Sequence, residues 1–357
     1  MFEREKLASV PAQSELYYWA DYVEMRCLTD ADGHFGAVRL GDLMNFAGDL
    51  AALSDDAVDA DESDVLDALL EGHATDELED QIAYEGDQDV EPDEVPEADT
   101  RLGRAAELTD DRRLWCESVF NLLRDREATL GDIYPFSIDG LNVSRLERTV
   151  PRDAYVFYLC CSLLRYVPKP VMQSLTSWFE FMSLEVLRRI LPPNAEVDAY
   201  GTARGKADSR FAGSQYERLT ALAAELRGKV LAEEHDFHPR DAGDNGLDVV
   251  GWVPMMDSAK GVPSFFGQCA CGVKWDAKQY EAGHERWREF IHLSSPSSKL
   301  TFIPHHYRSM GQHWYVATDV SGILVDRLRA LRFLAGDFSS VPTDVVSEAW
   351  SFQLAVV

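Results

Sequence analysis

Apolar residues recur every three or four positions in several long stretches of the chain, and this spacing predicts helices with one buried face. The clearest stretch is residues 14–28, where Leu16, Trp19 and Val23 follow the pattern. A second stretch opens with Thr109 as a candidate N-cap, followed by acidic residues in its first turn. The pattern predicts helices over residues 14–28, 109–127, 153–168, 174–193 and 214–231.

The last third of the chain changes to shorter apolar runs bounded by turn residues, and such runs predict strands. We expect strands over 247–254, 262–270, 299–306 and 314–320, and helices over 276–293 and 322–335. Strands that alternate with helices are typical of an α/β unit. The expected fold is therefore α+β or α/β, with a helical N-terminal region followed by an α/β domain that has a mixed central sheet.

A change in composition divides the chain into four segments. The segment between the first two helices is rich in acids and ends with Pro92 and Pro96, which break helices. We expect one short helix within it, over residues 64–73, and an irregular end. The predicted division is a helical N-terminal segment, an acidic insertion or linker, a helical domain and an α/β domain, at residues 1–53, 54–100, 101–200 and 201–357.

The charge of the chain is strongly negative and unevenly distributed. The formal net charge is −28, yet residues 51–100 hold 20 acids and no base, while the rest carries 42 acids against 34 bases. Nucleic acid and anionic membranes repel so acidic a protein, so it does not coat them with its whole surface. The near balance elsewhere leaves room for a local basic groove. The acidic segment is predicted to be a solvated insertion, and a DNA-mimicking or partner-binding strip is the alternative.

The sequence indicates neither a membrane-spanning protein nor a protein of an oxidising compartment. The most apolar stretch, residues 153–168, is shorter than the roughly 18 residues of a membrane span and contains Arg165. The six cysteines include an adjacent pair and a CxC, which do not resemble a secreted disulfide framework. We expect a soluble, cytoplasmic protein with reduced thiols and no membrane partner.

Several familiar chemistries lack their sequence signatures. The chain has no GxSxG and no GxxxxGK[ST], so hydrolase-elbow and P-loop chemistry are not indicated. A zinc site formed by the CxC of Cys269 and Cys271 with His305 and His306 is disfavoured, because structural zinc pairs are usually separated by two to four residues. The histidine pair could contact phosphate or have no role in binding.

Two neighbouring strands carry the most suggestive chemistry. The turn GDNGLD places Asp248 at the start of one predicted strand, and FFGQCA places Gln268 on the next, where the two side chains could face each other. Oxygen ligands of this kind, with a backbone carbonyl beside Gln268, could hold a hard divalent ion that assists phosphodiester hydrolysis. The alternative is purely structural: Asp248 caps its turn and Gln268 bonds to neighbouring backbone.

These residues resemble the PD-(D/E)XK restriction-endonuclease-like nucleases, especially the Mrr-like branch with its Asp followed by Gln-x-Lys. The resemblance covers roughly residues 211–300 and implies a restriction-endonuclease-like α/β domain. It implies Asp248 as the principal metal ligand, Gln268 at the second ligand position, and Glu217 on the preceding helix as an auxiliary acid that also approaches the metal. Glu180 competes for that last role. The implied metal is Mg²⁺ or Mn²⁺.

The sequence departs from the family at the position of the catalytic lysine. Two residues after Gln268, where the family has lysine, stands Ala270. Lys274 and Lys278 follow later, and Lys278 could reach back from the start of the next helix to stabilise developing charge.

A basic stretch could bind the DNA backbone. Between residues 204 and 229 there are six Lys or Arg against three acids, and Arg204, Lys206 and Arg210 are the candidates for phosphate contacts. A solvated helix face is the alternative. Trp275, Trp287 and Trp314 lie near the site in sequence, and we expect core packing for at least two of them.

The expected function is metal-dependent DNA cleavage by an endonuclease, and by analogy at the level of the family this would serve restriction or antiviral defence against foreign DNA. The alternative is a catalytically degenerate nuclease fold that acts as a DNA-binding or protein-interaction module. A protein partner would bind the N-terminal region or the acidic insertion. Nothing in the sequence fixes the oligomeric state.

Overall fold

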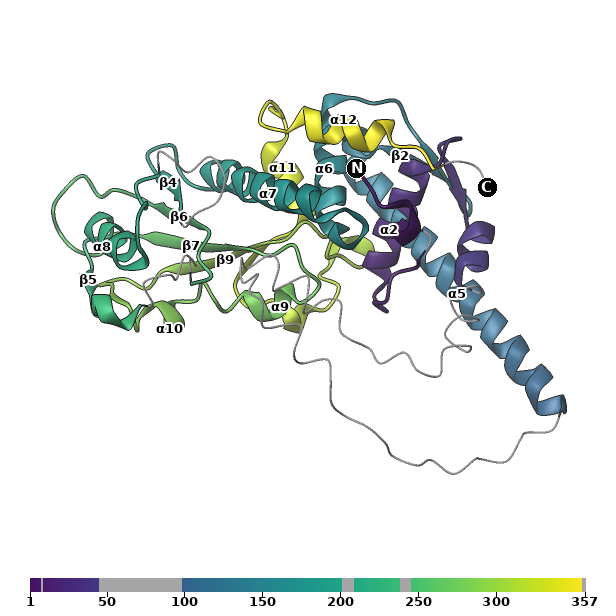
Figure 1. Ribbon diagram of the computed structural model, residues 1–357, viewed down its shortest axis with the longest axis horizontal. Helices are drawn as coiled ribbons and strands as arrows, with labels where there is room; N and C mark the ends of the chain where they lie inside the picture. The colour runs from purple at the N-terminus through teal and green to yellow at the C-terminus, as the bar shows by residue number, and fades with distance from the viewer. Residues whose placement is uncertain (8, 45–97, 201–208, 238–244, 355–357) are drawn as a thin grey trace.

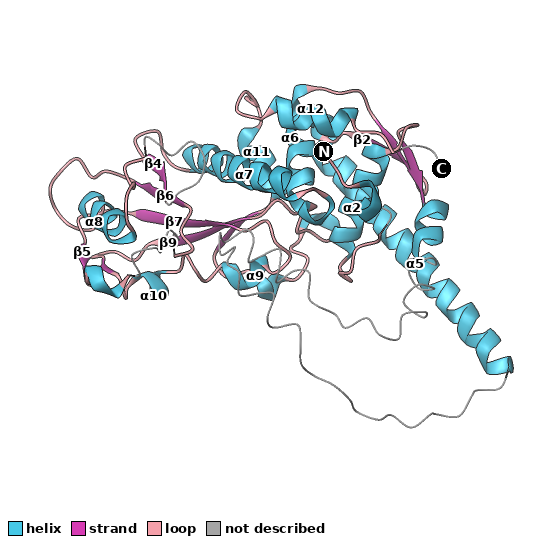
Figure 2. Ribbon diagram, in the orientation of Figure 1, coloured by secondary structure: helices cyan, strands magenta, loops and turns pink. Residues whose placement is uncertain are grey.

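The computed structural model describes residues 1–7, 9–44, 98–200, 209–237 and 245–354, with residues 98–111 described as backbone (Figure 1). The predicted helix at 64–73 and the irregular end of the acidic segment before residue 98 lie outside these ranges. Helices and strands are both present, so the predicted mixture of the two is confirmed (Figure 2).

The N-terminal region is mainly helical, as its periodicity predicts. Its helices are α1 (Arg4–Leu7), α2 (Leu16–Thr29), α5 (Ala98–Leu130), α6 (Val150–Ser162) and α7 (Lys169–Ile190). Thr149 caps α6 by accepting a hydrogen bond from the Arg152 backbone N–H. Helix α7 ends just before Pro192 and Pro193, which cannot continue it. Helix α5 begins at Ala98, eleven residues before the predicted Thr109.

A three-stranded sheet beside these helices was not predicted. It consists of β1 (His34–Gly36), β3 (Asn142–Arg145) and β2 (Phe136–Asp139), paired antiparallel in that order. Each of its strands is too short to show a clear alternation of apolar and polar residues. The dipeptide Asp139-Gly140 is nevertheless a hairpin signal, and Gly140 adopts the positive φ of 57° that such a turn needs.

The second sheet has five strands and is mixed, as expected. Its order is β10 (Ile323–Val325), β9 (Ser298–Phe302), β7 (Ser264–Cys269), β6 (Val249–Trp252) and β4 (Glu196–Ala199). Strands β4, β6 and β7 are antiparallel neighbours, whereas β7, β9 and β10 are parallel. Strand β4 lies before residue 201, so the sheet begins inside the segment predicted to be a helical domain.

Both faces of this sheet are buried by helices. Helix α7 packs on one face against β4, β6 and β7. The other face belongs to a separate apolar cluster that includes α8 (Gln215–Glu225) and Trp287 of α10 (His284–Trp287). Neighbouring residues of β6 divide between the two faces, since Val249 belongs to the α7 cluster and Val250 to the α8 cluster. The four residues of β6 are therefore all buried and apolar instead of alternating.

The helix predicted over residues 276–293 is wrong. The segment forms two short helices, α9 (Trp275–Lys278) and α10, and then the strand β8 (Ile291–His292), which pairs with β5 (Lys229–Val230). Gly283 interrupts the helix with extended backbone. Side chains also take up main-chain acceptors, because Gln279 donates to the Asp276 carbonyl and Trp287 donates to the Glu281 carbonyl. Strand β5 also shortens the helix predicted over 214–231 to α8, which ends at Glu225.

The strand predicted over residues 314–320 is also wrong. Its middle forms the 3-10 helix Ala317–Asp319, and the edge strand β10 comes later. The segment predicted as one helix over 322–335 therefore divides into β10 and α11 (Arg327–Leu334), separated by the N-cap Asp326. Asp326 accepts a hydrogen bond from the Arg329 backbone N–H, which fixes where the helix begins. A last helix, α12 (Thr343–Ser351), was not predicted.

The C-terminal helices join the sheet to the N-terminal helices in one core. Helix α11 packs against α6 and α7, and α12 packs against α6 and α2 (Figure 1). A continuous cluster of buried apolar residues runs from Phe2 to Ala349. The part of the chain that the structure describes contains no helix that is both long and apolar enough to cross a membrane.

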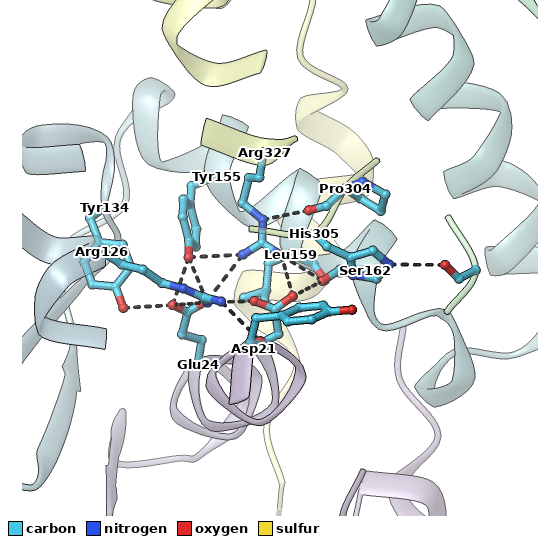
Figure 3. A network of polar contacts seen from close by, with 12 residues as sticks. Asp21, Glu24, Arg126, Tyr134, Tyr155, Leu159, Ser162, Pro304, His305 and Arg327 are labelled. Carbon is cyan, nitrogen blue, oxygen red and sulfur yellow. Dashed lines mark hydrogen bonds and ion pairs between the residues drawn. The ribbon is translucent and has the colours of Figure 1, made fainter. Parts of the chain in front are cut away.

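A buried ionic network lies at this junction (Figure 3). Asp21 and Glu24 of α2 face Arg126 of α5 and Arg327 of α11, and these four side chains are fully buried. Two carboxylates thus balance two guanidinium groups. Tyr134, Tyr155 and Ser162 donate their hydroxyl protons to the same carboxylates. Each of the four charges thus has an opposite charge beside it, although Nε of Arg126 has no hydrogen-bond partner among the described residues.

Candidate functional site

Asp248 is held at the start of β6 by bonds on both sides of Gln268. Its backbone N–H donates to the Gly267 carbonyl at 3.0 Å, and its Oδ2 accepts the Cys269 backbone N–H at 2.6 Å. The carboxylate is 6% exposed. Asp248 therefore reaches the neighbouring strand β7 at Gln268, as the sequence predicts.

The side chains of Asp248 and Gln268 share one face of the sheet. Val250 of β6 pairs with Phe266 of β7, and both belong to the cluster on the α8 side. Because side chains alternate along a strand, the residues two positions further on, Asp248 and Gln268, point to that same side. Thr301 of β9 pairs with Gln268 and extends the polar row to a third strand.

The amide of Gln268 is held in an unusual state. The side chain is 7% exposed, and its Oε1 has no hydrogen-bond donor among the described residues. A buried carbonyl oxygen without a donor costs about 1–3 kcal/mol. Such an atom invites a cation or a donor from a ligand.

Two thiols on the opposite face connect this site to α7. Burial raises the pKa of both Cys269 and Cys271. The carboxylates of Asp248 and Glu180 raise the pKa of both further, and Ser183 of α7 lowers that of Cys269. Glu180 and Asp248 thus act on the same two sulfur atoms. Glu180 lies on α7, on the opposite side of the sheet from the Asp248 and Gln268 side chains.

The two candidates for a catalytic lysine lie at the two ends of α9. Ala270, at the position of the family lysine, is a buried core residue. Lys278, at the end of α9, is half-buried, and its charge lowers the pKa of Cys271, which burial, Cys161 and Glu180 raise. Lys274 is exposed. Lys278 and the carboxylates of Asp248 and Glu180 thus act on the pKa of the same thiol, in opposite directions.

Glu217, predicted as the auxiliary acid, has a structural role at the start of α8. It forms a capping box with Ser214: its Oε2 accepts the Ser214 backbone N–H at 2.8 Å, and Ser214 Oγ accepts the Glu217 N–H. The bonds to Ser214 lower the pKa of Glu217. The sequence S-x-x-E is itself a capping signal, and it favours this role over a metal ligand.

The predicted basic face is only partly described. Arg204 and Lys206 lie outside the described residues. Arg210 forms ion pairs with three carboxylates, those of Glu196, Asp198 and Glu225. A phosphate would have to compete with these acids for the Arg210 guanidinium group.

The two histidines considered for a zinc site lie in the core. His305 and His306 are fully buried, and burial lowers the pKa of both. In the described ranges no group of three or more His, Cys, Asp or Glu side chains is placed to hold a metal ion. Their burial also excludes the phosphate contact considered for the histidine pair. Trp275 and Trp287 pack in the core as expected.

Comparison with protein-family models, curated protein sequences and solved structures finds no match to this chain.

Proposed function

We propose that this protein is a metal-dependent endonuclease that hydrolyses DNA, with its active centre at Asp248 and Gln268. The observation that carries the proposal is the buried Gln268 Oε1, which has no donor among the described residues and belongs to a side chain on the same face of the sheet as Asp248. A bound cation would supply a partner for the Gln268 oxygen. A merely structural amide would be expected to have found a hydrogen-bond donor.

The donor set fits Mg²⁺ or Mn²⁺ better than zinc. One carboxylate and one amide are hard oxygen ligands, and no group of three His, Cys, Asp or Glu side chains accompanies them in the described parts of the chain. Mg²⁺ usually keeps several waters and needs only one or two carboxylates from the protein. When bound, the ion would polarise a phosphate and lower the pKa of a water.

Residues of the protein itself would supply the other catalytic roles. Asp248 and Gln268 hold the ion at the end of two strands that are fixed by the core. Lys278 supplies a positive charge near the developing phosphate charge. Glu180 of α7 remains the other candidate for the auxiliary acid, because Glu217 caps its own helix.

DNA is proposed as the substrate from the resemblance to PD-(D/E)XK nucleases, with restriction or defence as the role. The order of elements supports it: α7 with Glu180, β6 preceded by Asp248, then β7 with Gln268. The mixed sheet that joins them agrees with a restriction-endonuclease-like domain. The excess of acids requires any DNA to approach a restricted part of the surface.

One observation favours a second candidate, a non-cleaving nuclease fold that binds DNA or a protein. Ala270 fills the lysine position with a buried methyl group, so cleavage depends on a lysine from elsewhere. If Lys278 does not serve, the protein would bind without cutting.

The test is a cleavage assay with supercoiled plasmid and linear duplex in Mg²⁺, Mn²⁺ or EDTA. The wild type is compared with Asp248→Ala and with the control Asp257→Ala, whose exposed carboxylate lies in the loop at the other end of the same hairpin. Metal-dependent cutting that is lost only in Asp248→Ala supports the endonuclease. DNA binding without cutting, in every metal, supports the second candidate.

A further inference from the structure

The loop that leads from Gln268 to Lys278 is held by two residues from elsewhere in the chain. Tyr18 of α2 donates its hydroxyl proton to the Val273 carbonyl at 3.2 Å. Nε2 of His305 lies 3.4 Å from the Gly272 carbonyl. Two consecutive carbonyls are thus bound from outside the sheet, directly before α9.

His305 acts on the Gly272 carbonyl as a neutral imidazole that donates a hydrogen bond. A carbonyl oxygen accepts and never donates, so the proton must be on Nε2 and Nδ1 must be bare. Burial lowers the pKa of His305 to about 4, so the ring is neutral at neutral pH. The edge-on rings of Tyr17 and Tyr18, with centroids 5.9 Å and 5.0 Å from the imidazole, fix its orientation.

The first residue of α9 is anchored in the same place. Trp275 is buried and packs edge-on against Tyr307, with ring centroids 4.7 Å apart. Tyr307 in turn packs against Tyr17 at 5.2 Å. Lys278 follows Trp275 by three residues, so one short helical turn connects the aromatic anchor to the lysine.

The position of α2 is itself fixed. Asp21 lies one turn after Tyr18 and is bonded to Arg126 at 2.7 Å and to Arg327 at 2.7 Å. Both arginines are fully buried. The helix that carries Tyr18 therefore cannot shift without breaking two buried ion pairs.

We propose that Tyr18 and His305 are positioning residues that set the place of Lys278 relative to Asp248 and Gln268. The N-terminal helical region is then part of the active centre and not only a sensing module. This inference rests on the proposed function for its catalytic consequence, but the placement of Lys278 can be measured without any cleavage. Losing one bond to the loop should lower kcat about tenfold and leave KM within about twofold, since substrate binding is not touched.

The experiment uses the full chain with its lysines labelled by reductive ¹³C-methylation. The chain has only eight lysines, and the Lys278 signal is assigned by its loss in Lys278→Arg. Tyr18→Phe removes the hydroxyl and keeps the ring. The matched control is Tyr22→Phe on the same helix, whose hydroxyl donates to the Leu7 carbonyl at 3.1 Å. We expect the Lys278 signal to move in Tyr18→Phe and to stay in Tyr22→Phe.

Variants of His305 test the inference independently of Tyr18. His305→Gln retains an N–H donor and should keep the Lys278 signal nearer its wild-type position than His305→Ala does. If His305→Ala fails to fold, the comparison of Tyr18→Phe with Tyr22→Phe decides whether the inference holds. An unmoved Lys278 signal in Tyr18→Phe overturns the inference, whatever the cleavage assay gives. A moved signal in a protein that cuts no DNA supports the positioning role and counts against the proposed function alone.

Discussion

Arg327 at the start of α11 donates to the Asp21 carboxylate of α2 at 2.7 Å, although 306 residues separate them in sequence. Both side chains are fully buried, and the same carboxylate also accepts the hydroxyl proton of Ser162. The pair ties the C-terminal helix to the first long helix of the chain. A contact between such distant residues makes the N-terminal region and the sheet interdependent.

Breaking this pair from one side should be costly. Arg327→Met leaves the Asp21 carboxylate buried with only Arg126 to balance it and Glu24, and we expect the free energy of unfolding to fall by about 3–5 kcal/mol. Urea denaturation followed by circular dichroism measures it. Asp337→Asn removes the exposed partner of Arg189 and should leave the midpoint unchanged. Equal, small effects of the two variants would show that the buried network adds little to the free energy of unfolding.

The buried histidines should make the protein sensitive to mild acid. Burial lowers the pKa of His305 to about 4 and also lowers that of His306, whereas both titrate near 6.5 in an unfolded chain. As the pH falls from about 6.5 to about 4, the unfolded chain binds protons that the folded chain does not. Each histidine then reduces stability by about 1.4 kcal/mol per pH unit.

This pH dependence can be assigned to one residue. Urea midpoints measured between pH 7 and pH 4 should fall less steeply for His305→Gln than for the wild type, because glutamine binds no proton. His235→Gln is the control, since it removes an exposed imidazole and leaves both buried ones in place. Parallel curves for His305→Gln and the wild type would contradict the prediction.

The thiols of the site should be inert in the folded protein. Burial raises the pKa of Cys269 and Cys271, and nearby carboxylates raise it further, so little thiolate forms near neutral pH. We expect iodoacetamide at pH 8 to label neither residue in buffer and both in urea, as read by mass spectrometry of peptides. Rapid labelling in buffer would mean that the face toward α7 opens to solvent.

The sequence predicted the elements that depend on local periodicity. The helices α2, α6, α7 and α8 and the strands β6, β7 and β9 were expected because their apolar spacing repeats over several residues. Strand β4 and the strands of the small sheet were missed, since four residues carry too little periodicity. The segment after Lys274 was misread, because Gly283 and main-chain bonds from Gln279 and Trp287 divide a stretch whose composition favours a helix.

The same distinction holds at the site. The facing of Asp248 and Gln268 follows from strand alternation and could be predicted. The capping role of Glu217 was also legible in its S-x-x-E sequence, although the resemblance implied a role near the metal. The bonds from Tyr18 and His305 to the loop before Lys278 are tertiary contacts across more than 30 residues, and no local signal indicates them.

A comparison of two buried glutamines tests the central claim most directly. Gln279 is fully bonded: its amide donates to the carbonyls of Asp276 and Asp319, and its Oε1 accepts the Ser321 N–H. Gln268 has an Oε1 with no donor among the described residues. Without metal, Gln279→Leu should lower the free energy of unfolding by about 2–4 kcal/mol through the loss of three hydrogen bonds, whereas Gln268→Leu should be neutral or stabilising.

In Mn²⁺ binding, Gln268→Leu should be the impaired variant and Gln279→Leu the unimpaired one. Titration calorimetry of Gln268→Leu should show affinity reduced at least about tenfold, since one of two protein ligands is gone, and Gln268→Glu should bind more tightly because a carboxylate replaces the amide. Gln279→Leu, where it remains folded, should bind as the wild type does. If instead Gln268→Leu is strongly destabilised and binds Mn²⁺ normally, the amide is a structural group, and the metal centre must lie elsewhere in the chain.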